Sequence, residues 1–83
     1  MEKNEAEKIV LNILTDICDD EIVKEEPDID LLEEGLIDSL DYVDMLVRFE
    51  DSFGIVMSPS ELARDEMNTP AKIVAQVLKR IGQ

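Results

Sequence analysis

Residues 38–54 read DSLDYVDMLVRFEDSFG, and this stretch contains both ends and one full face of a helix. Asp38 can cap the free N–H groups of the first turn, and Asp41, three residues later, adds a favourable negative charge there. The apolar residues of a buried face recur at three- and four-residue steps: Tyr42, Met45, Leu46, Phe49 and Phe53. Gly54 ends the pattern. The sequence therefore predicts a helix that begins directly after Asp38, with Ser39 at its first position.

Two other long helices are predicted from the same spacing. The first covers about Asn4 to Ile17 and places six apolar residues on one side: Ala6, Ile9, Val10, Ile13, Leu14 and Ile17. Leu11 falls off this face and is expected to be partly exposed or covered by the loop that follows. The last helix begins after Thr69 with Pro70 in its first turn. Its buried face is expected to consist of Val74, Val77, Leu78 and Ile81, supported by Ile73.

The segments between these helices differ in character. Ser58, Pro59 and Glu61 form a capping box, which predicts a short helix that runs through Leu62. Between Asp19 and Asp38 the helical spacing fails, which predicts a long first loop. Its apolar residues are too many for a free linker and are expected to pack on the helices: Ile29, Leu31, Leu32, Leu36 and Ile37.

Length and composition limit what such a chain can do. Eighty-three residues suffice for a single domain, 1–83, with no room for a deep cleft. Twenty-one acidic residues against eight basic ones give a net charge of −13, which disfavours nucleic acid and attracts basic protein surfaces. Cys18 is the only cysteine and histidine is absent, so an internal disulfide, conventional catalytic triads and zinc sites are excluded. No signal peptide or membrane-length apolar run is seen, which makes the cytoplasm the expected location.

The helix after Asp38 has a second apolar face, made of Leu40, Val43 and Val47. We call these three residues the apolar strip. Asp38, Asp41 and Asp44 border it. Either the long first loop folds over the strip, or the strip is exposed and receives a partner that has apolar contacts and a basic rim.

Residues 34–41, EGLIDSLD, resemble the modification motif of acyl and peptidyl carrier proteins. That resemblance implies an all-α, four-helix acyl-carrier-protein-like bundle, with three main helices, one short helix and a long first loop. It also implies that Ser39 bears a covalent 4′-phosphopantetheine arm, on which an acyl or aminoacyl group is carried as a thioester. The chain would then be a non-catalytic, monomeric carrier, and Asp38, Leu40, Asp41, Val43, Asp44 and Val47 would contact its partner enzymes.

Two segments are similar to the D-alanyl carrier proteins, which serve the D-alanylation of teichoic acids: residues 27–40, PDIDLLEEGLIDSL, and 64–73, RDEMNTPAKI. The partners so implied are a phosphopantetheinyl transferase, an adenylating D-alanine ligase and a downstream acyltransferase. The chain departs from that family at Leu62, where an aromatic residue is usual, at Ala63, where Asp is usual, and at Met67, where Trp is usual. Asp41 is a fourth departure, because it is more like the residue of a general acyl carrier protein. The cargo therefore stays open between D-alanine and fatty-acyl, polyketide or other acyl chains.

Two other classes of protein, a calcium-binding protein and an unmodified adaptor, compete with the carrier. Asp28, Asp30, Glu33 and Glu34 prompt a calcium-binding loop, but Leu32, Glu33 and Ser39 stand where an EF-hand needs an oxygen ligand, Gly and Glu, so no metal site is predicted. An unmodified helical adaptor that binds its partner through the apolar strip remains a third hypothesis.

Overall fold

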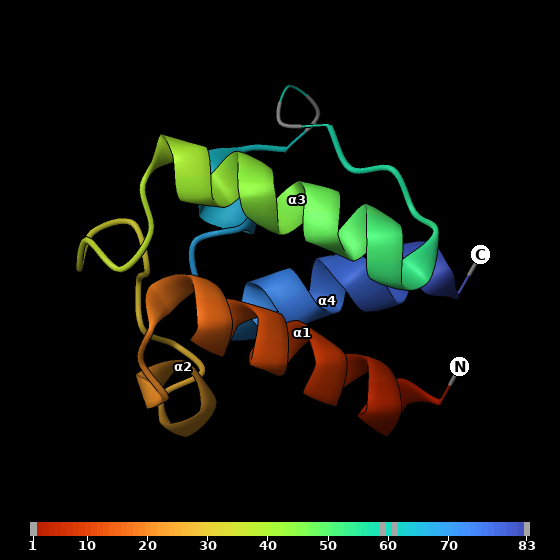
Figure 1. Cartoon of the computed structure of the whole chain (residues 1–83), viewed down its shortest axis with the longest axis horizontal. Coiled ribbons are helices and arrows are strands. Elements are labelled where there is room, and N and C mark those ends of the chain that lie inside the picture. Colours follow the sequence, from red (N-terminus) through yellow and green to blue (C-terminus); the bar gives the residue numbers. More distant parts are fainter. Residues whose placement is uncertain (1, 59, 61, 83) are drawn as a thin grey trace.

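A computed structural model gives the structure of residues 2–58, 60 and 62–82. Its helices are α1 (Lys3–Cys18), α2 (Ile22–Glu25), α3 (Ser39–Phe53) and α4 (Pro70–Ile81), with a 3₁₀ turn, η2 (Arg64–Glu66), before the last (Figure 1). No strand occurs in those ranges. The predicted all-α bundle with three main helices is therefore confirmed.

The helix ends follow the capping residues predicted for them. Asp38 precedes α3 and Gly54 follows it in the left-handed conformation, with φ 68°. Thr69 caps α4, its hydroxyl oxygen accepting the N–H of Lys72 at 3.2 Å, and Pro70 occupies the first turn. The first helix ends where Asp19 turns left-handed, with φ 53°, and its N–H donates to the carbonyl of Thr15.

The buried faces of α1, α3 and α4 meet in one core. Its fully enclosed members come from each helix: Ala6, Val10 and Leu14 from α1, Met45 and Phe49 from α3, and Ile73 and Val77 from α4. The predicted stripes thus pack inward, although Tyr42, Phe53, Leu78 and Ile81 at their edges are only half-buried. Leu11, predicted off the stripe, also packs against this core.

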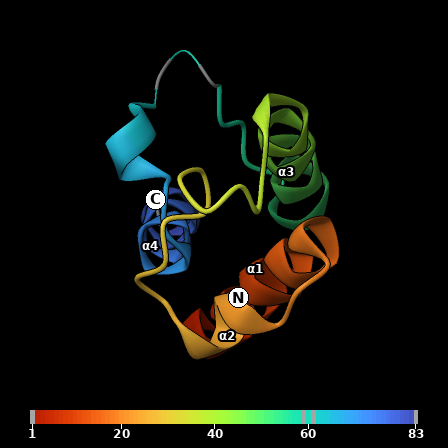
Figure 2. The same ribbon diagram turned by 90° about the vertical axis from the view of Figure 1, so that its left-hand side faces the viewer.

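The long first loop contains a helix that the sequence analysis did not predict. The residues of α2 form a single turn that buries Val23 in the core. At its start, the side chain of Asp20 accepts the N–H of Ile22 at 3.0 Å. Figure 2, an end-on view of the bundle, shows the rest of the loop crossing from the side of α4 to the start of α3. As predicted, its apolar residues pack down: Leu31 and Ile37 are buried, and Ile29, Leu32 and Leu36 lie against the core.

The connection from α3 to α4 is where the sequence predicts a short helix. Two residues of the predicted short helix, Pro59 and Glu61, lie outside the described residues. Ser60, which lies between them, has 3₁₀ conformation. A further short helical element follows at η2, where the side chain of Glu66 accepts the N–H of Ala63 at 2.9 Å. Met57 and Met67, on either side of this segment, are buried and belong to the same core.

Candidate functional site

Ser39 is the first residue of α3 and is exposed to solvent. A reciprocal capping box holds it there: Asp38 Oδ1 accepts the N–H of Asp41 at 2.8 Å, and Asp41 Oδ2 accepts the N–H of Asp38 at 3.2 Å. The carbonyl of Asp38 accepts the N–H of Tyr42 at 2.9 Å and begins the helical ladder. The serine hydroxyl therefore projects from a fixed helix start, as the sequence predicted.

Two opposing electrostatic effects act on a group attached to Ser39. The N–H groups of the first turn of a helix have no carbonyl partner within it, and the helix dipole makes this end partly positive. The unpaired N–H groups and the helix dipole both favour a negatively charged group such as a phosphodiester. The carboxylates of Asp38 and Asp41 oppose it, although each already accepts a backbone N–H from the other residue.

A surface pocket of about 680 Å³ opens beside Ser39. The long first loop supplies one wall, with Leu32, Gly35 and Ile37, and α3 supplies the other, with Asp38, Ser39, Tyr42 and Val43. The φ of Gly35, 72°, lies in the left-handed region, which explains a glycine at this bend. The pocket therefore has a mostly apolar lining and the serine at its edge.

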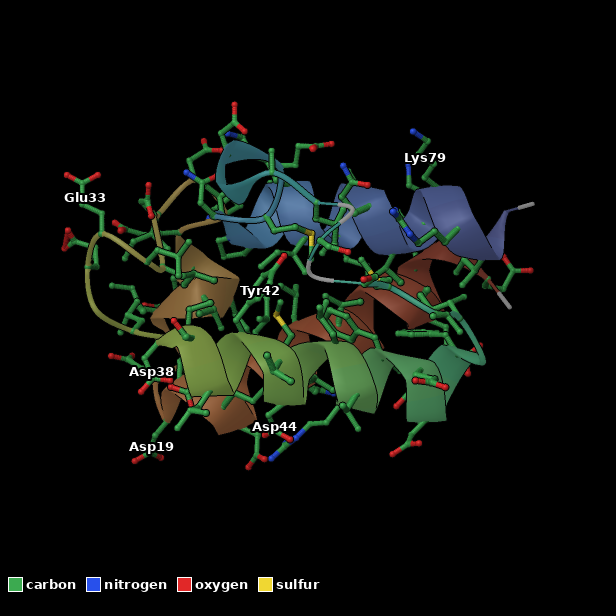
Figure 3. The ribbon with its side chains drawn as sticks, turned by 90° about the horizontal axis from the view of Figure 1, so that it is seen from above. Asp19, Glu33, Asp38, Tyr42, Asp44 and Lys79 are labelled. Atoms are coloured by element: carbon green, nitrogen blue, oxygen red, sulfur yellow. The ribbon has the colours of Figure 1, made fainter. Side chains whose placement is uncertain are left out.

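Tyr42 belongs to this pocket as much as to the core where the sequence placed it. Its half-buried ring points from α3 toward α4 in Figure 3 and packs against the core. Burial raises the pKa of its hydroxyl; Glu66 raises it further and Arg80 lowers it. The phenol thus stays protonated at neutral pH, and its hydroxyl can donate a hydrogen bond.

The apolar strip is exposed. The exposed fraction is 80% for Leu40, 48% for Val43 and 50% for Val47, so the alternative in which the long first loop covers the strip is wrong. On the other side of α3 from Tyr42, Asp44 borders the strip (Figure 3). Exposed apolar side chains beside carboxylates suit a partner with apolar and basic groups.

Arg48 forms ion pairs that the sequence analysis did not anticipate, one of them with an aspartate that borders the apolar strip. Its guanidinium pairs with Asp16 of α1 and, at 3.2 Å, with Asp44 one turn earlier in α3. The hydrogen bond to Asp16 is the largest effect on the pKa of Arg48 and raises it; burial, the next largest, lowers it, and the charge and hydrogen bond of Asp44 raise it. The spacing of Asp44 and Arg48 could have indicated the second pair, whereas the first joins helices that are distant in sequence.

Cys18 lies half-buried at the end of α1. Burial, followed by the charges of Asp41 and Asp20, raises its pKa from 9.0 to about 11, so it is a poor nucleophile at neutral pH. Across the described ranges, no three His, Cys, Asp or Glu side chains are grouped so that they could hold a metal ion. None of the described helices combines the length and the apolar character that crossing a membrane requires.

Three of the four departures noted in the sequence lie in the connection before α4. Met67 is wholly buried and Leu62 is half-buried against the core, whereas Ala63 is exposed. None of them is among the residues that line the pocket beside Ser39. The differences at Leu62, Ala63 and Met67 therefore lie in the connection before α4, whereas the fourth departure, Asp41, lies in the first turn of α3 beside Ser39.

Comparison with known proteins agrees with this geometry. The family described as "Phosphopantetheine attachment site" matches residues 8–77, a span that includes Ser39 and both walls of the pocket. The chain is 47% identical to a D-alanyl carrier protein of Abiotrophia defectiva over 76 residues, which are 92% of this chain and 96% of that protein. It is 47% identical to the D-alanyl carrier protein of Bacillus subtilis (strain 168) over 82% of this chain and 87% of the relative. A third relative, from Bacillus cereus (strain B4264), has the same description and is 40% identical over 88% and 92% of the two chains.

Proposed function

This chain belongs to the phosphopantetheine-attachment family and, within it, to the D-alanyl carrier proteins, and on that basis we propose that Ser39 bears the arm and that D-alanine is its cargo. The family consists of carriers, so the chain is a substrate and shuttle for other enzymes and has no catalytic site of its own. The single observation that supports Ser39 is its position: an exposed hydroxyl at the capped start of α3, inside the matched span.

The residues around Ser39 fit a phosphopantetheine group. A phosphodiester at Ser39 would be favoured by the uncapped N–H groups of the first turn of α3, and the adjoining pocket of about 680 Å³ is large enough for an extended small molecule. When bound, the group supplies a terminal thiol that carries the aminoacyl cargo as a thioester. Asp38 fixes the helix start, and Tyr42 and Ile37 provide an apolar surface beside the serine.

The partner enzymes must supply the acid–base chemistry. Histidine is absent from the chain, and the thiol of Cys18 remains protonated at neutral pH. The carboxylates of Asp38 and Asp41 beside Ser39 are engaged in the helix cap, so we assign to the transferase the base that accepts the proton of the Ser39 hydroxyl when the phosphodiester forms. This division of labour leaves the carrier with two tasks, to present the serine and to be recognised.

Recognition is proposed to use the first half of α3. Leu40, Val43 and Val47 would bury their exposed apolar surface against a partner, while Asp38, Asp41 and Asp44 would steer a basic rim toward it. The partners are a phosphopantetheinyl transferase, an adenylating D-alanine ligase and a downstream acyltransferase. Coenzyme A and ATP feed the first two, so we place the loading of this carrier in the cytoplasm, with the carrier acting as a monomer.

Intact-mass measurement tests the attachment site. The chain coexpressed with a phosphopantetheinyl transferase should gain the mass of one phosphopantetheinyl group, and the gain should disappear in Ser39→Ala. Ser52→Ala is the matched control, because Ser52 is exposed on the same helix yet lies outside the pocket. An unchanged gain in Ser39→Ala, or its loss in Ser52→Ala alone, would disprove the assignment.

The cargo is tested on the modified carrier. Incubation with ATP, a D-alanine ligase and labelled D-alanine should give a labelled protein whose label is released by hydroxylamine, as a thioester requires. L-alanine should be loaded much less. Failure with D-alanine together with efficient loading by a fatty-acyl ligase would assign the chain to the alternative acyl carriers.

A further inference from the structure

A pair of side chains fastens the long first loop to the segment that leads into α4. Asp30 Oδ2 accepts a hydrogen bond from Asn68 Nδ2 at 2.8 Å, although the two residues are 38 positions apart. The backbone repeats this connection, because the N–H of Leu31 donates to the carbonyl of Asn68 at 2.7 Å. A second backbone bond, from the N–H of Ala71 to the carbonyl of Pro27 at 2.9 Å, lies beside it.

Both residues of the pair make further hydrogen bonds on their own side. Asp30 Oδ1 accepts the N–H groups of Leu32 at 3.1 Å and Glu33 at 2.9 Å, and so shapes the loop. Asn68 Oδ1 accepts a bond from Lys72 Nζ at 3.2 Å, in the first turn of α4. The two side chains are only partly exposed. The contact therefore joins the loop to α4 through an unbroken series of hydrogen bonds.

The part of the loop that reaches Ser39 depends on this fastened point. The N–H of Glu34 donates to the carbonyl of Asp30 at 2.9 Å, and those of Leu36 and Ile37 donate to the carbonyl of Leu31 at 2.9 and 3.3 Å. Residues 34–37 thus fold back on the two residues that Asn68 holds. The same segment supplies a wall of the pocket and ends at Asp38, the cap of α3.

We propose that Asp30 and Asn68 are positioning residues: their hydrogen bond fixes the wall of the pocket and, through it, the presentation of Ser39 to the transferase. Neither side chain lines the pocket or belongs to the apolar strip, so they act through the loop and not by touching a partner. The inference rests on the proposed attachment at Ser39. It predicts that loss of the contact lowers the kcat of phosphopantetheinylation and leaves the KM for the carrier nearly unchanged.

An exchange of the two residues isolates the contact. In Asn68→Asp two carboxylates face each other, so the hydrogen bond is replaced by repulsion. In the double variant Asp30→Asn/Asn68→Asp the amide of residue 30 can donate to the new carboxylate, its oxygen can still accept the two loop N–H groups, and Lys72 keeps an acceptor. The double variant has the net charge of the wild type and can restore the hydrogen bonds named above.

The measured quantity is the rate of phosphopantetheinylation by a purified transferase with coenzyme A, followed by intact mass. We expect kcat to fall about tenfold in Asn68→Asp, the scale of one hydrogen bond to a charged group, and to recover to within about twofold in the double variant. Asn12→Asp, on the exposed surface of α1, is the control for the added charge and should match the wild type. The assay is run well below the unfolding transition, where lower stability alone changes neither kcat nor KM.

Hydrogen exchange supplies a readout that does not depend on the transferase. The amides of residues 34–37 should exchange faster in Asn68→Asp than in wild type and regain protection in the double variant. Should Asn68→Asp fail to fold, Asp30→Asn is the milder substitute, for which the same local loss of protection and a smaller fall in kcat are expected.

The outcomes separate the two proposals. A wild-type chain that is never modified at Ser39 would remove the proposed function and this inference with it. A modified wild type with an equally fast Asn68→Asp, or a double variant as slow as the single one, would overturn the positioning role while leaving the carrier assignment in place.

Discussion

The cap of α3 permits a sharp test of how the helix start determines the site. Asp38→Ala removes the side-chain oxygen that accepts the N–H of Asp41 at 2.8 Å but keeps the reciprocal bond from the backbone of residue 38. Loss of one such cap costs about 1 kcal/mol of unfolding free energy, within a range of about 0.5–2. In a domain of this size that corresponds to a fall in Tm of about 4–8 °C.

Asp38→Asn is the matched variant. It removes the same negative charge from a chain whose net charge is −13, yet its amide oxygen can still cap the helix. The difference between the two variants therefore reports the cap without the change in overall repulsion. We expect the Ala variant to be less stable than the Asn variant by about 1 kcal/mol.

Urea unfolding followed by far-ultraviolet circular dichroism measures this difference, with equal m-values as the check that both variants unfold from the same structure. Phosphopantetheinylation should follow the same order, since fraying of the first turn displaces Ser39 itself. If the two variants agreed in unfolding free energy to within about 0.3 kcal/mol, the usual error of such comparisons, the capping argument for the start of α3 would be refuted.

Three other predictions concern side chains outside the cap. Leu40→Ser should change the unfolding free energy by less than about 0.5 kcal/mol, because the side chain is already exposed, and yet should raise the KM for partner enzymes. Val56→Ser is the control: Val56 is 72% exposed and lies outside the apolar strip, so this variant should leave both the unfolding free energy and the KM unchanged. Arg48→Gln frees Asp44 from its ion pair, so binding to a basic transferase should become faster at low salt and lose that advantage as salt is added. Cys18 has a pKa of about 11 against 9.0 when unfolded, so at pH 8 it should react with a thiol reagent about 100-fold more slowly than a free cysteine. The free energy of unfolding should fall as pH rises from 9 toward 11, because only the unfolded thiol ionises in that range. Equal labelling of native and unfolded protein would contradict this.

The parts of the structure that the sequence predicted depend on local signals. Caps act over three residues and helical faces repeat every three or four, so Asp38, Gly54 and Thr69 were enough to place the ends of α3 and the start of α4. The same local register places Ser39 at the start of α3, and its modification stays a prediction that rests on the motif around it. The exposure of the apolar strip could not be decided in the same way, because it depends on where the long first loop goes.

The parts that the sequence did not predict depend on contacts between distant residues. A single turn such as α2 has too few residues to show periodicity, and it forms because Val23 finds a place in the core. The hydrogen bond between Asp30 and Asn68 spans 38 residues and leaves no local pattern. The pocket beside Ser39 likewise exists only because the loop and α3 are brought together.

The start of α1 and the end of α4 lie at one end of the bundle, and the start of α3 lies at the other (Figure 1). A tether joined to either terminus would therefore point the serine away from whatever holds the protein. Such a carrier, immobilised on a surface or linked between two other domains, would keep the end that bears Ser39 accessible to its partner enzymes. The same geometry would let dyes at a terminus and on the arm report, through the distance between them, when a partner draws the arm outward.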